Sequence, residues 1–121
     1  MSPLILVVDD LEELRLLVML TLAPLGRVDC AADIAGAMEL IEREYPDVLV
    51  LDVMLARDEN GLDLCRALKA APATRSIRIV LLSARGQQSD IEEGLAAGAD
   101  RYVVKPFSPE RLVALVDELI P

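Results

Sequence analysis

Residues 48–52 read VLVLD, an unbroken apolar run of strand length that ends at an aspartate. A second run of this kind, LILVV at 4–8, is followed by Asp9 and Asp10. Strands that are apolar on both faces are typical of a parallel sheet covered by helices on each side. Three further runs follow this pattern less cleanly: 77–82 is interrupted by Arg78, 103–104 is short, and 28–31 is the weakest.

Segments with helical spacing separate these runs. Asp33 and Ser108 stand where helix N-caps are expected, and Pro109 follows Ser108 at the first helical position. Strict alternation of five strands with five helices predicts a (βα)5 fold, a doubly wound five-stranded parallel sheet with right-handed crossovers. The predicted helices span 11–24, 33–44, 61–70, 87–97 and 108–120.

The composition indicates one soluble domain over residues 1–121. Hydrophobic residues make up 54% of the chain, charged residues 27%, and the net charge is −9. Such an acidic chain repels nucleic-acid phosphate and anionic lipid, so we expect neither nucleic acid nor membrane as a direct partner. The amino terminus lacks a signal-peptide pattern, and Cys30 and Cys65 form no CxxC motif. We therefore expect a cytoplasmic protein with reduced thiols.

Polar residues stand at the carboxyl ends of the strands, where ligands bind in such sheets. Asp9 and Asp10 follow the first strand, Asp52 the third, Ser83 the fourth and Lys105 the fifth. Three converging carboxylates resist joint ionisation, and a hard divalent cation such as Mg²⁺ relieves their repulsion. A metal beside an aspartate, with a lysine and a hydroxyl nearby, predicts phosphoryl chemistry on a carboxylate.

The absence of histidine from the chain excludes several other chemistries. Ser-His-Asp and Cys-His catalysis and histidine-ligated zinc all need an imidazole. Any phosphohistidine that takes part in the reaction must therefore belong to another protein.

Four motifs resemble the receiver domain of two-component response regulators, across essentially the whole chain. The resemblance implies a CheY-like, flavodoxin-like fold with strand order 2-1-3-4-5. It also implies a signalling switch rather than an enzyme, one that catalyses its own phosphotransfer and loses the phosphoryl group slowly. The motifs are VVDD at 7–10, LVLDVML at 49–55, LLSA at 81–84 and GADRYVVKPF at 98–107.

The resemblance also implies a role for each site residue. Asp52 is the expected phosphoacceptor. Mg²⁺, for which Mn²⁺ can substitute, is expected on Asp10 directly, on Asp9 through water, on Asp52 and on the backbone carbonyl of Met54. The remaining expectations are Ser83, Ala84, Lys105 and Tyr102 as phosphoryl-binding and switch residues, and Pro106 after a cis peptide bond.

The implied partner is a sensor histidine kinase or a histidine phosphotransfer protein. Phosphorylation is expected to repack the face formed by the helix at 87–97, the strand at 103–104 and the helix at 108–120, and so to control an output partner or domain. A homodimer through this face, or through the helix at 11–24, is a further expectation. The sequence is compatible with a stand-alone receiver and with one cut from a longer protein.

The chain departs from the family pattern in the loop after Asp52. The family commonly has Pro four residues after its aspartate and Gly eight after it. Here the fourth residue is Ala56 and the glycine is Gly61, nine residues on, so the charged loop 56–60 is one residue longer. Met54 and Arg85 are expected to flank the phosphoryl group. An apolar Met54 cannot orient a water molecule, which favours slow self-dephosphorylation.

Two other functions on similar sheets fit less well. A phosphohydrolase with an aspartate nucleophile needs a second acid two residues later, where this chain has Met54. A flavodoxin-like module needs a Ser/Thr/Gly-rich phosphate loop after the first strand. Asp9, Asp10 and Glu12 at that place would repel the flavin phosphate.

The helix at 11–24 is apolar on more than one side. At 100° per residue, its predicted core face carries Leu14, Leu17, Val18, Thr21 and Leu22. Leu16, Met19, Leu20 and Ala23 gather on the opposite side, which a surface helix normally keeps polar. Scattered exposed aliphatic side chains are one interpretation. The other is a contact patch, formed by Leu16, Met19 and Leu20, for a histidine-containing partner, a second receiver or a further domain. The family resemblance favours the first of these.

Overall fold

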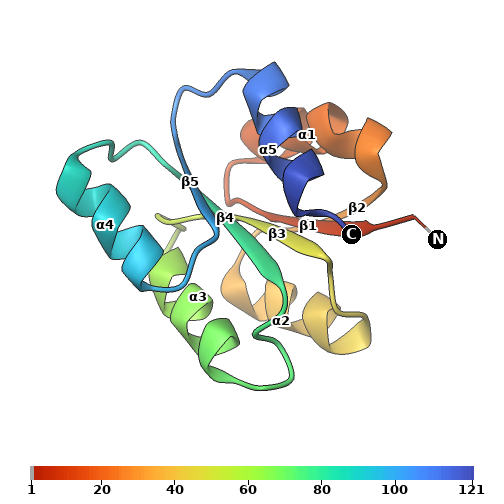
Figure 1. The fold of residues 1–121 in the computed structure, drawn as a ribbon, viewed down its shortest axis with the longest axis horizontal. Helices are drawn as coiled ribbons and strands as arrows, with labels where there is room; N and C mark the ends of the chain where they lie inside the picture. Colours follow the sequence, from red (N-terminus) through yellow and green to blue (C-terminus); the bar gives the residue numbers. More distant parts are fainter. Residues whose placement is uncertain (1) are drawn as a thin grey trace.

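The computed structural model describes residues 2–121, in which strands and α-helices alternate five times along the chain (Figure 1). The observed elements agree with the predicted pattern, and a short 3-10 helix, η1 (Ala23–Leu25), follows the first α-helix. The strands are β1 (Leu4–Val8), β2 (Arg27–Ala31), β3 (Val48–Asp52), β4 (Arg78–Ser83) and β5 (Arg101–Val104). The helices are α1 (Glu12–Leu22), α2 (Ile34–Arg43), α3 (Gly61–Ala70), α4 (Gln88–Ala96) and α5 (Pro109–Leu119).

The five strands form one parallel sheet in the order β2-β1-β3-β4-β5. This order confirms the predicted fold class. Val8 of β1 lies beside Leu51 of β3, and Asp52 lies beside Leu82 of β4. Ser83 in turn pairs with Val104 of β5. The register therefore brings the carboxyl ends of β1, β3, β4 and β5 to the same edge of the sheet.

The sheet separates two apolar layers, because successive residues of each strand point to opposite faces. α1 and α5 cover one face, and α2, α3 and α4 lie on the other (Figure 1). β1 and β3 are buried along their whole length, which explains why neither alternates with polar residues. Under α1 and α5 the helical core residues are Val18, Leu22, Leu112 and Val116; under α2 and α3 they include Ala37, Ile41, Leu64 and Leu68.

Side chains cap two helices as predicted. The Asp33 carboxylate accepts a hydrogen bond from the Gly36 amide at the start of α2, and the Ser108 hydroxyl accepts one from Arg111 at the start of α5. α1 has no side-chain cap of this kind. Its N-cap residue is Leu11, which makes no side-chain cap bond, and Asp9 instead turns its carboxylate back to the Leu11 amide.

The α1 core face is narrower than predicted. Leu14, Val18 and Leu22 follow an i, i+4, i+8 stripe that packs on the sheet and α5. Leu17 was expected on this stripe but is 47% exposed, because it lies 100° away from Val18 around the helix. Met19 was expected to be exposed with Leu16 and Leu20, but its side chain is half-buried.

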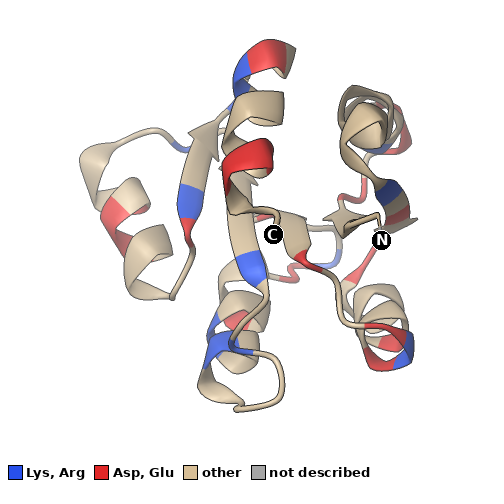
Figure 2. Ribbon diagram, turned by 45° about the vertical axis from the view of Figure 1, so that its right-hand side comes forward, with Lys and Arg blue, Asp and Glu red and all other residues tan. Residues whose placement is uncertain are grey.

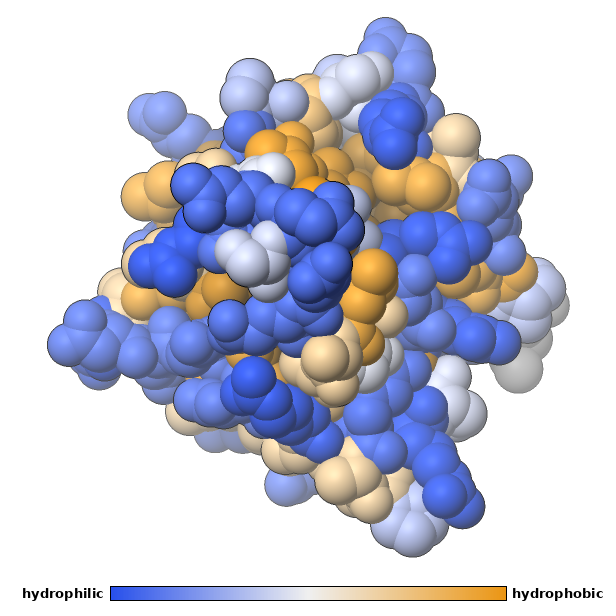
Figure 3. Space-filling model, turned by 60° about the vertical axis from the view of Figure 1, so that its left-hand side comes forward, coloured by the Kyte–Doolittle hydropathy of each residue, from blue (hydrophilic) through white to orange (hydrophobic). Residues whose placement is uncertain are grey.

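α4 is the α-helix with the fewest buried residues, since Gly94 alone is buried along its length. Its Leu95 is 47% exposed. Figure 3 turns the α4 side of the molecule toward the viewer and shows a mostly hydrophilic surface broken by separate apolar areas. Acidic and basic residues are interspersed over the helices (Figure 2). No α-helix in residues 2–121 is long and apolar enough to cross a lipid bilayer.

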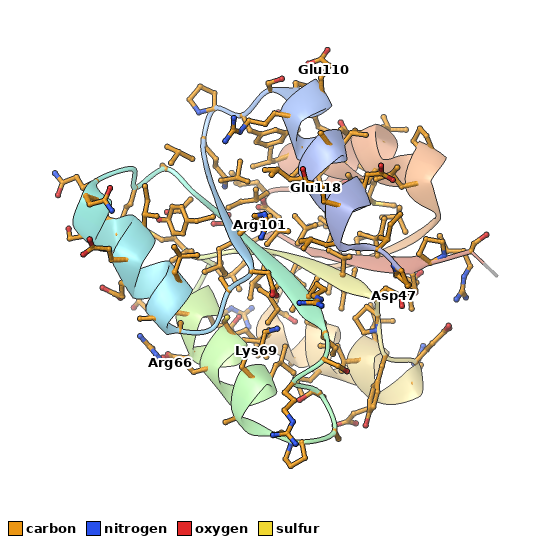
Figure 4. The ribbon with its side chains drawn as sticks, viewed as in Figure 1. Asp47, Arg66, Lys69, Arg101, Glu110 and Glu118 are labelled. Atoms are coloured by element: carbon orange, nitrogen blue, oxygen red, sulfur yellow. The ribbon has the colours of Figure 1, made fainter. Side chains whose placement is uncertain are left out.

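Charged residues fasten the amino-terminal end of β4 to its neighbours. The Asp100 carboxylate accepts from the Lys69 ammonium at 3.0 Å, from Arg78 at 3.3 Å and from the Ile79 amide at 2.8 Å. Burial opposes ionisation of Asp100, but the Ile79 amide and the Lys69 ammonium outweigh it and lower the pKa of this carboxyl. Nearby, Arg101 of β5 reaches Glu118 of α5 (Figure 4).

This arrangement predicts a pH-dependent loss of stability in Asp100→Asn. A carboxyl whose pKa is lowered by folding stabilises the fold above its unfolded pKa of about 4, and this contribution is lost as the pH falls through the folded pKa. We expect Asp100→Asn to lower the free energy of unfolding by about 1–3 kcal/mol at pH 7. In urea titrations the difference from the wild type should shrink below about pH 4. Asp63→Asn, at an exposed ion pair with Arg66, is the control and should show no such trend.

Candidate functional site

Three carboxylates meet at the carboxyl edge of the sheet. One carboxylate oxygen from each of Asp9, Asp10 and Asp52 lies within 4.8 Å of the others. Asp9 and Asp52 are 1% and 4% exposed, whereas Asp10 is half-buried. Asp9 and Asp10 follow β1 and Asp52 ends β3, so the pairing of these two strands fixes the cluster.

Lys105 supplies the positive charge of the cluster. Its ammonium group lies 2.9 Å from Asp52 Oδ2 and 3.8 Å from Asp9 Oδ2. The Lys105 amide donates to the Ser83 carbonyl, which extends the β4–β5 pairing by one residue beyond β5. The Lys105–Pro106 peptide bond is cis.

Asp9 has one satisfied and one unsatisfied carboxylate oxygen. Oδ1 accepts from the Leu11 amide at 3.0 Å, while Oδ2 is buried without a hydrogen-bond partner. Burial, reinforced by the charges of Asp52 and Asp10, raises the pKa of Asp9 above its usual value. An unpartnered buried carboxylate oxygen beside two other carboxylates fits a hard divalent cation, which would supply the missing contact.

The Asp52 carboxylate is held from two sides. Oδ2 accepts from Lys105, and Oδ1 accepts from the Met54 amide at 3.0 Å. These two bonds fix the orientation of the carboxylate, and an aspartate oxygen can act as a nucleophile toward phosphorus. The Met54 side chain is 55% exposed and lies along a cleft of about 180 Å³ that Arg85 and Tyr102 also line.

A short chain of hydrogen bonds joins Ser83 to Tyr102 through the backbone of Arg85. The Ser83 hydroxyl oxygen accepts from the Arg85 amide at 3.0 Å, and the Tyr102 hydroxyl donates to the Arg85 carbonyl at 2.8 Å. Ser83 is 1% exposed, whereas the neighbouring Ala84 is exposed and its methyl side chain offers no hydrogen-bonding group. The Tyr102 ring lies against Gly94 of α4, where a Cβ atom would collide with ring carbons.

The longer loop after Asp52 folds into a small hairpin. Met54 and Asn60 form an antiparallel bridge, and Leu55 donates to the Glu59 carbonyl. Arg57 and Asp58 at the tip both have φ near +60°, the sign pattern of a type I′ turn. Gly61 closes the loop at a position where a Cβ atom would collide with the Asp52 carbonyl, so only glycine allows this approach.

Two side chains near the site were not singled out by the sequence. Arg15 donates to the Asp9 carbonyl at 2.8 Å, and Glu59 accepts from the Ile34 amide at 3.1 Å. Both partners are backbone groups, which leave no residue-type signal in a sequence. The exposed residues Leu16 and Leu20 face away from the buried core on α1 and are not part of the carboxylate cluster.

Comparison with known proteins places this arrangement in one family. The family model described as the response regulator receiver domain matches residues 5–117. The chain is 41% identical over 121 residues to the phosphate regulon transcriptional regulatory protein PhoB of Rhizobium meliloti, covering 99% of this chain and 53% of that protein. It is 39% identical over 120 residues to the response regulator PleD of Caulobacter vibrioides, covering 98% and 26%. The chain thus spans about half or less of these relatives.

Solved structures agree with this assignment. The response regulator DrrB of Thermotoga maritima superposes with a TM-score of 0.86 at 37% identity, covering 98% of this chain and 52% of that one. The chemotaxis protein CheY4 of Vibrio cholerae superposes with a TM-score of 0.89 at 28% identity, covering 99% and 100%. With the sheet order and the cluster of Asp9, Asp10 and Asp52, these matches show that the chain belongs to the response regulator receiver domain family.

Proposed function

We propose that this chain is a phosphorylation-dependent signalling switch and that Asp52 is its phosphoacceptor. The observation that supports this most directly is the setting of the Asp52 carboxylate, which is buried, held by Lys105 and flanked by Asp9 and Asp10. The donor is the phosphohistidine of a sensor histidine kinase or of a histidine phosphotransfer protein. An Asp52 oxygen forms a bond to phosphorus as the bond from phosphorus to the imidazole nitrogen breaks, and the imidazole keeps the electron pair.

Asp9, Asp10, Asp52 and the Met54 carbonyl would hold Mg²⁺, or Mn²⁺ in its place. When bound, the cation neutralises charge on the phosphoryl oxygens. The chain's own groups do the rest. Met54 N–H and Lys105 orient the Asp52 carboxylate, and Lys105 remains to pair with the negative charge that the phosphoryl group adds. The exposed apolar side chain of Met54 offers no group to orient an attacking water, which favours a long-lived phosphoryl group.

The Ser83–Arg85–Tyr102 link supports a route from the site to the surface. If the Ser83 hydroxyl turns to a phosphoryl oxygen, its bond from the Arg85 amide is lost, and the backbone of Arg85, whose carbonyl accepts from Tyr102, is freed to move. The Tyr102 ring packs on Gly94, so a new ring position changes how α4 packs against the sheet. This is a two-state packing element biased by a local charge, and the α4–β5–α5 face is its output.

The assignment of Asp52 is tested by labelling with acetyl phosphate. Asp52→Asn should abolish incorporation, because the amide is not a nucleophile for phosphorus. Lys105→Ala should still incorporate phosphate but should lose the conformational response, measured as amide shift changes in α4 by NMR. Asp29→Asn, at an exposed carboxylate on β2, is the matched control and should label normally. Labelling of Asp52→Asn at the wild-type rate would show that the nucleophile is another residue.

Mg²⁺ should stabilise the fold by relieving the repulsion among Asp9, Asp10 and Asp52. A ligand present at 100 times its dissociation constant, and bound only to the folded state, adds about 2.7 kcal/mol. Thermal melts in EDTA and in millimolar Mg²⁺ should therefore differ in midpoint for the wild type and for Asp29→Asn. Asp10→Asn should lose the difference. Equal midpoints in the wild type would contradict this metal site.

The exposed apolar face of α1 is the proposed contact for the phosphodonor. Leu16 and Leu20 are 49% and 75% exposed, and Leu17 extends the same face. The double variant Leu16→Glu/Leu20→Glu should keep the fold and acetyl-phosphate labelling but slow phosphotransfer from the cognate donor, measured by transfer of radiolabelled phosphate. Tyr45→Glu, at a side chain 54% exposed in the connection between α2 and β3, should transfer normally. Unchanged transfer in the double variant would reduce this face to ordinary exposed surface, and a dimer that dissociates in it would assign the face to self-association.

A further inference from the structure

The hairpin after β3 is joined to the rest of the domain through Glu59. Within residues 2–121, the Glu59 carboxylate makes the one hydrogen bond that leads from residues 55–59 to another part of the chain. It accepts from the Ile34 amide at 3.1 Å, at the first residue of α2. The other bonds of this segment stay within the hairpin, where Leu55 donates to the Glu59 carbonyl and Glu59 donates to the Ala56 carbonyl.

The start of α2 is well suited to hold this carboxylate. The first amides of a helix have no partner within the helix, and the helix dipole favours a negative charge at this end. Asp33 satisfies the Gly36 amide, and Glu59 satisfies the Ile34 amide from 25 residues away. Glu59 is half-buried, so this contact is shielded from water on one side.

The same hairpin carries the Met54 carbonyl, the backbone group in the proposed cation site. Met54 pairs with Asn60, so the position of one hairpin arm sets the position of the other. The tip does not anchor the hairpin, because Arg57 and Asp58 are exposed and both hold left-handed backbone conformations that are unfavourable for non-glycine residues. The buried Leu55 side chain fixes one arm, and Glu59 is the polar anchor of the other.

We propose that Glu59 is a positioning residue for the cation site: by binding the start of α2, it holds the hairpin so that the Met54 carbonyl faces Asp9, Asp10 and Asp52. This inference rests on the proposed function of the carboxylate cluster. The contact between Glu59 and the Ile34 amide touches neither the cation nor the phosphoryl group directly. Outer groups that orient metal ligands typically contribute about 10–100-fold to metal affinity. For a single hydrogen bond acting through a hairpin we expect the lower end of that range.

The test is the Mg²⁺ dissociation constant of the full chain, measured by isothermal titration calorimetry. Glu59→Ala should weaken Mg²⁺ binding by roughly tenfold. Glu59→Gln keeps an acceptor oxygen but removes the charge that the helix dipole favours, so it should weaken Mg²⁺ binding less than Glu59→Ala does. Equal weakening in Glu59→Gln and Glu59→Ala would show that Glu59 acts through its charge alone and would overturn the proposal.

Two control variants separate positioning from general stability. Asp33→Ala removes the other side-chain cap of α2 and should lower the melting temperature while leaving the Mg²⁺ dissociation constant unchanged. Asp58→Asn removes a charge one residue away, at a position where asparagine tolerates the left-handed backbone, and should also leave Mg²⁺ binding unchanged. Weakening by Asp33→Ala equal to that by Glu59→Ala would also overturn the proposal.

A second measurement needs no metal. In Glu59→Ala, hydrogen exchange of the Leu55 amide should become faster, because its acceptor is the Glu59 carbonyl, while the Gly36 amide at Asp33 should keep its protection. Wild-type protection of Leu55 in this variant would show that the hairpin does not depend on Glu59. Absence of Mg²⁺ binding by the wild type would overturn the cation site itself, whereas wild-type binding with an unaffected Glu59→Ala variant overturns this inference alone.

Discussion

The repulsion among three carboxylates is the constraint on which the site depends. Asp9, Asp10 and Asp52 are brought together by the pairing of two apolar strands, and the energy that holds them there comes from the core rather than from the site. Lys105 offsets part of the repulsion, but its ammonium lies nearer to Asp52 than to Asp9. Burial, together with the neighbouring negative charges, raises the pKa of Asp9, and one of its oxygens has no hydrogen-bond partner. A divalent cation would relieve this repulsion, whereas a phosphoryl group would add negative charge that the cation and Lys105 must offset.

The fold and the cluster were predictable because both depend on local patterns combined with topology. Four of the five apolar runs are followed by, or end in, a polar site residue, and alternation with helices brings those ends to one edge. Helix starts at Asp33 and Ser108 were predictable for the same reason, since a cap acts on amides two or three residues away. None of these inferences requires knowledge of how distant side chains pack.

The predictions that failed or were missing depend on distant partners. Leu17 was assigned to the core from periodicity alone, yet the width of a buried stripe depends on what lies opposite the helix. Glu59 of the hairpin at 54–60 accepts a hydrogen bond from an amide 25 residues earlier, and amides carry no residue identity. The contact of Arg15 was equally hard to predict, because its partner, the Asp9 carbonyl, is also a backbone group. The sequence marks such residues only as charged positions near the site.

The loose attachment of α4 has a thermodynamic consequence. This helix buries one residue, Gly94, whereas α3 buries five, so moving α4 exposes little apolar surface. Two packing positions of α4 can therefore differ by a small free energy. A bias of about 1.4 kcal/mol changes their population ratio tenfold. Forming one new charge-assisted hydrogen bond in the site provides a bias of that order. A bias of this size could not move α3, because its displacement would expose the five residues that it buries.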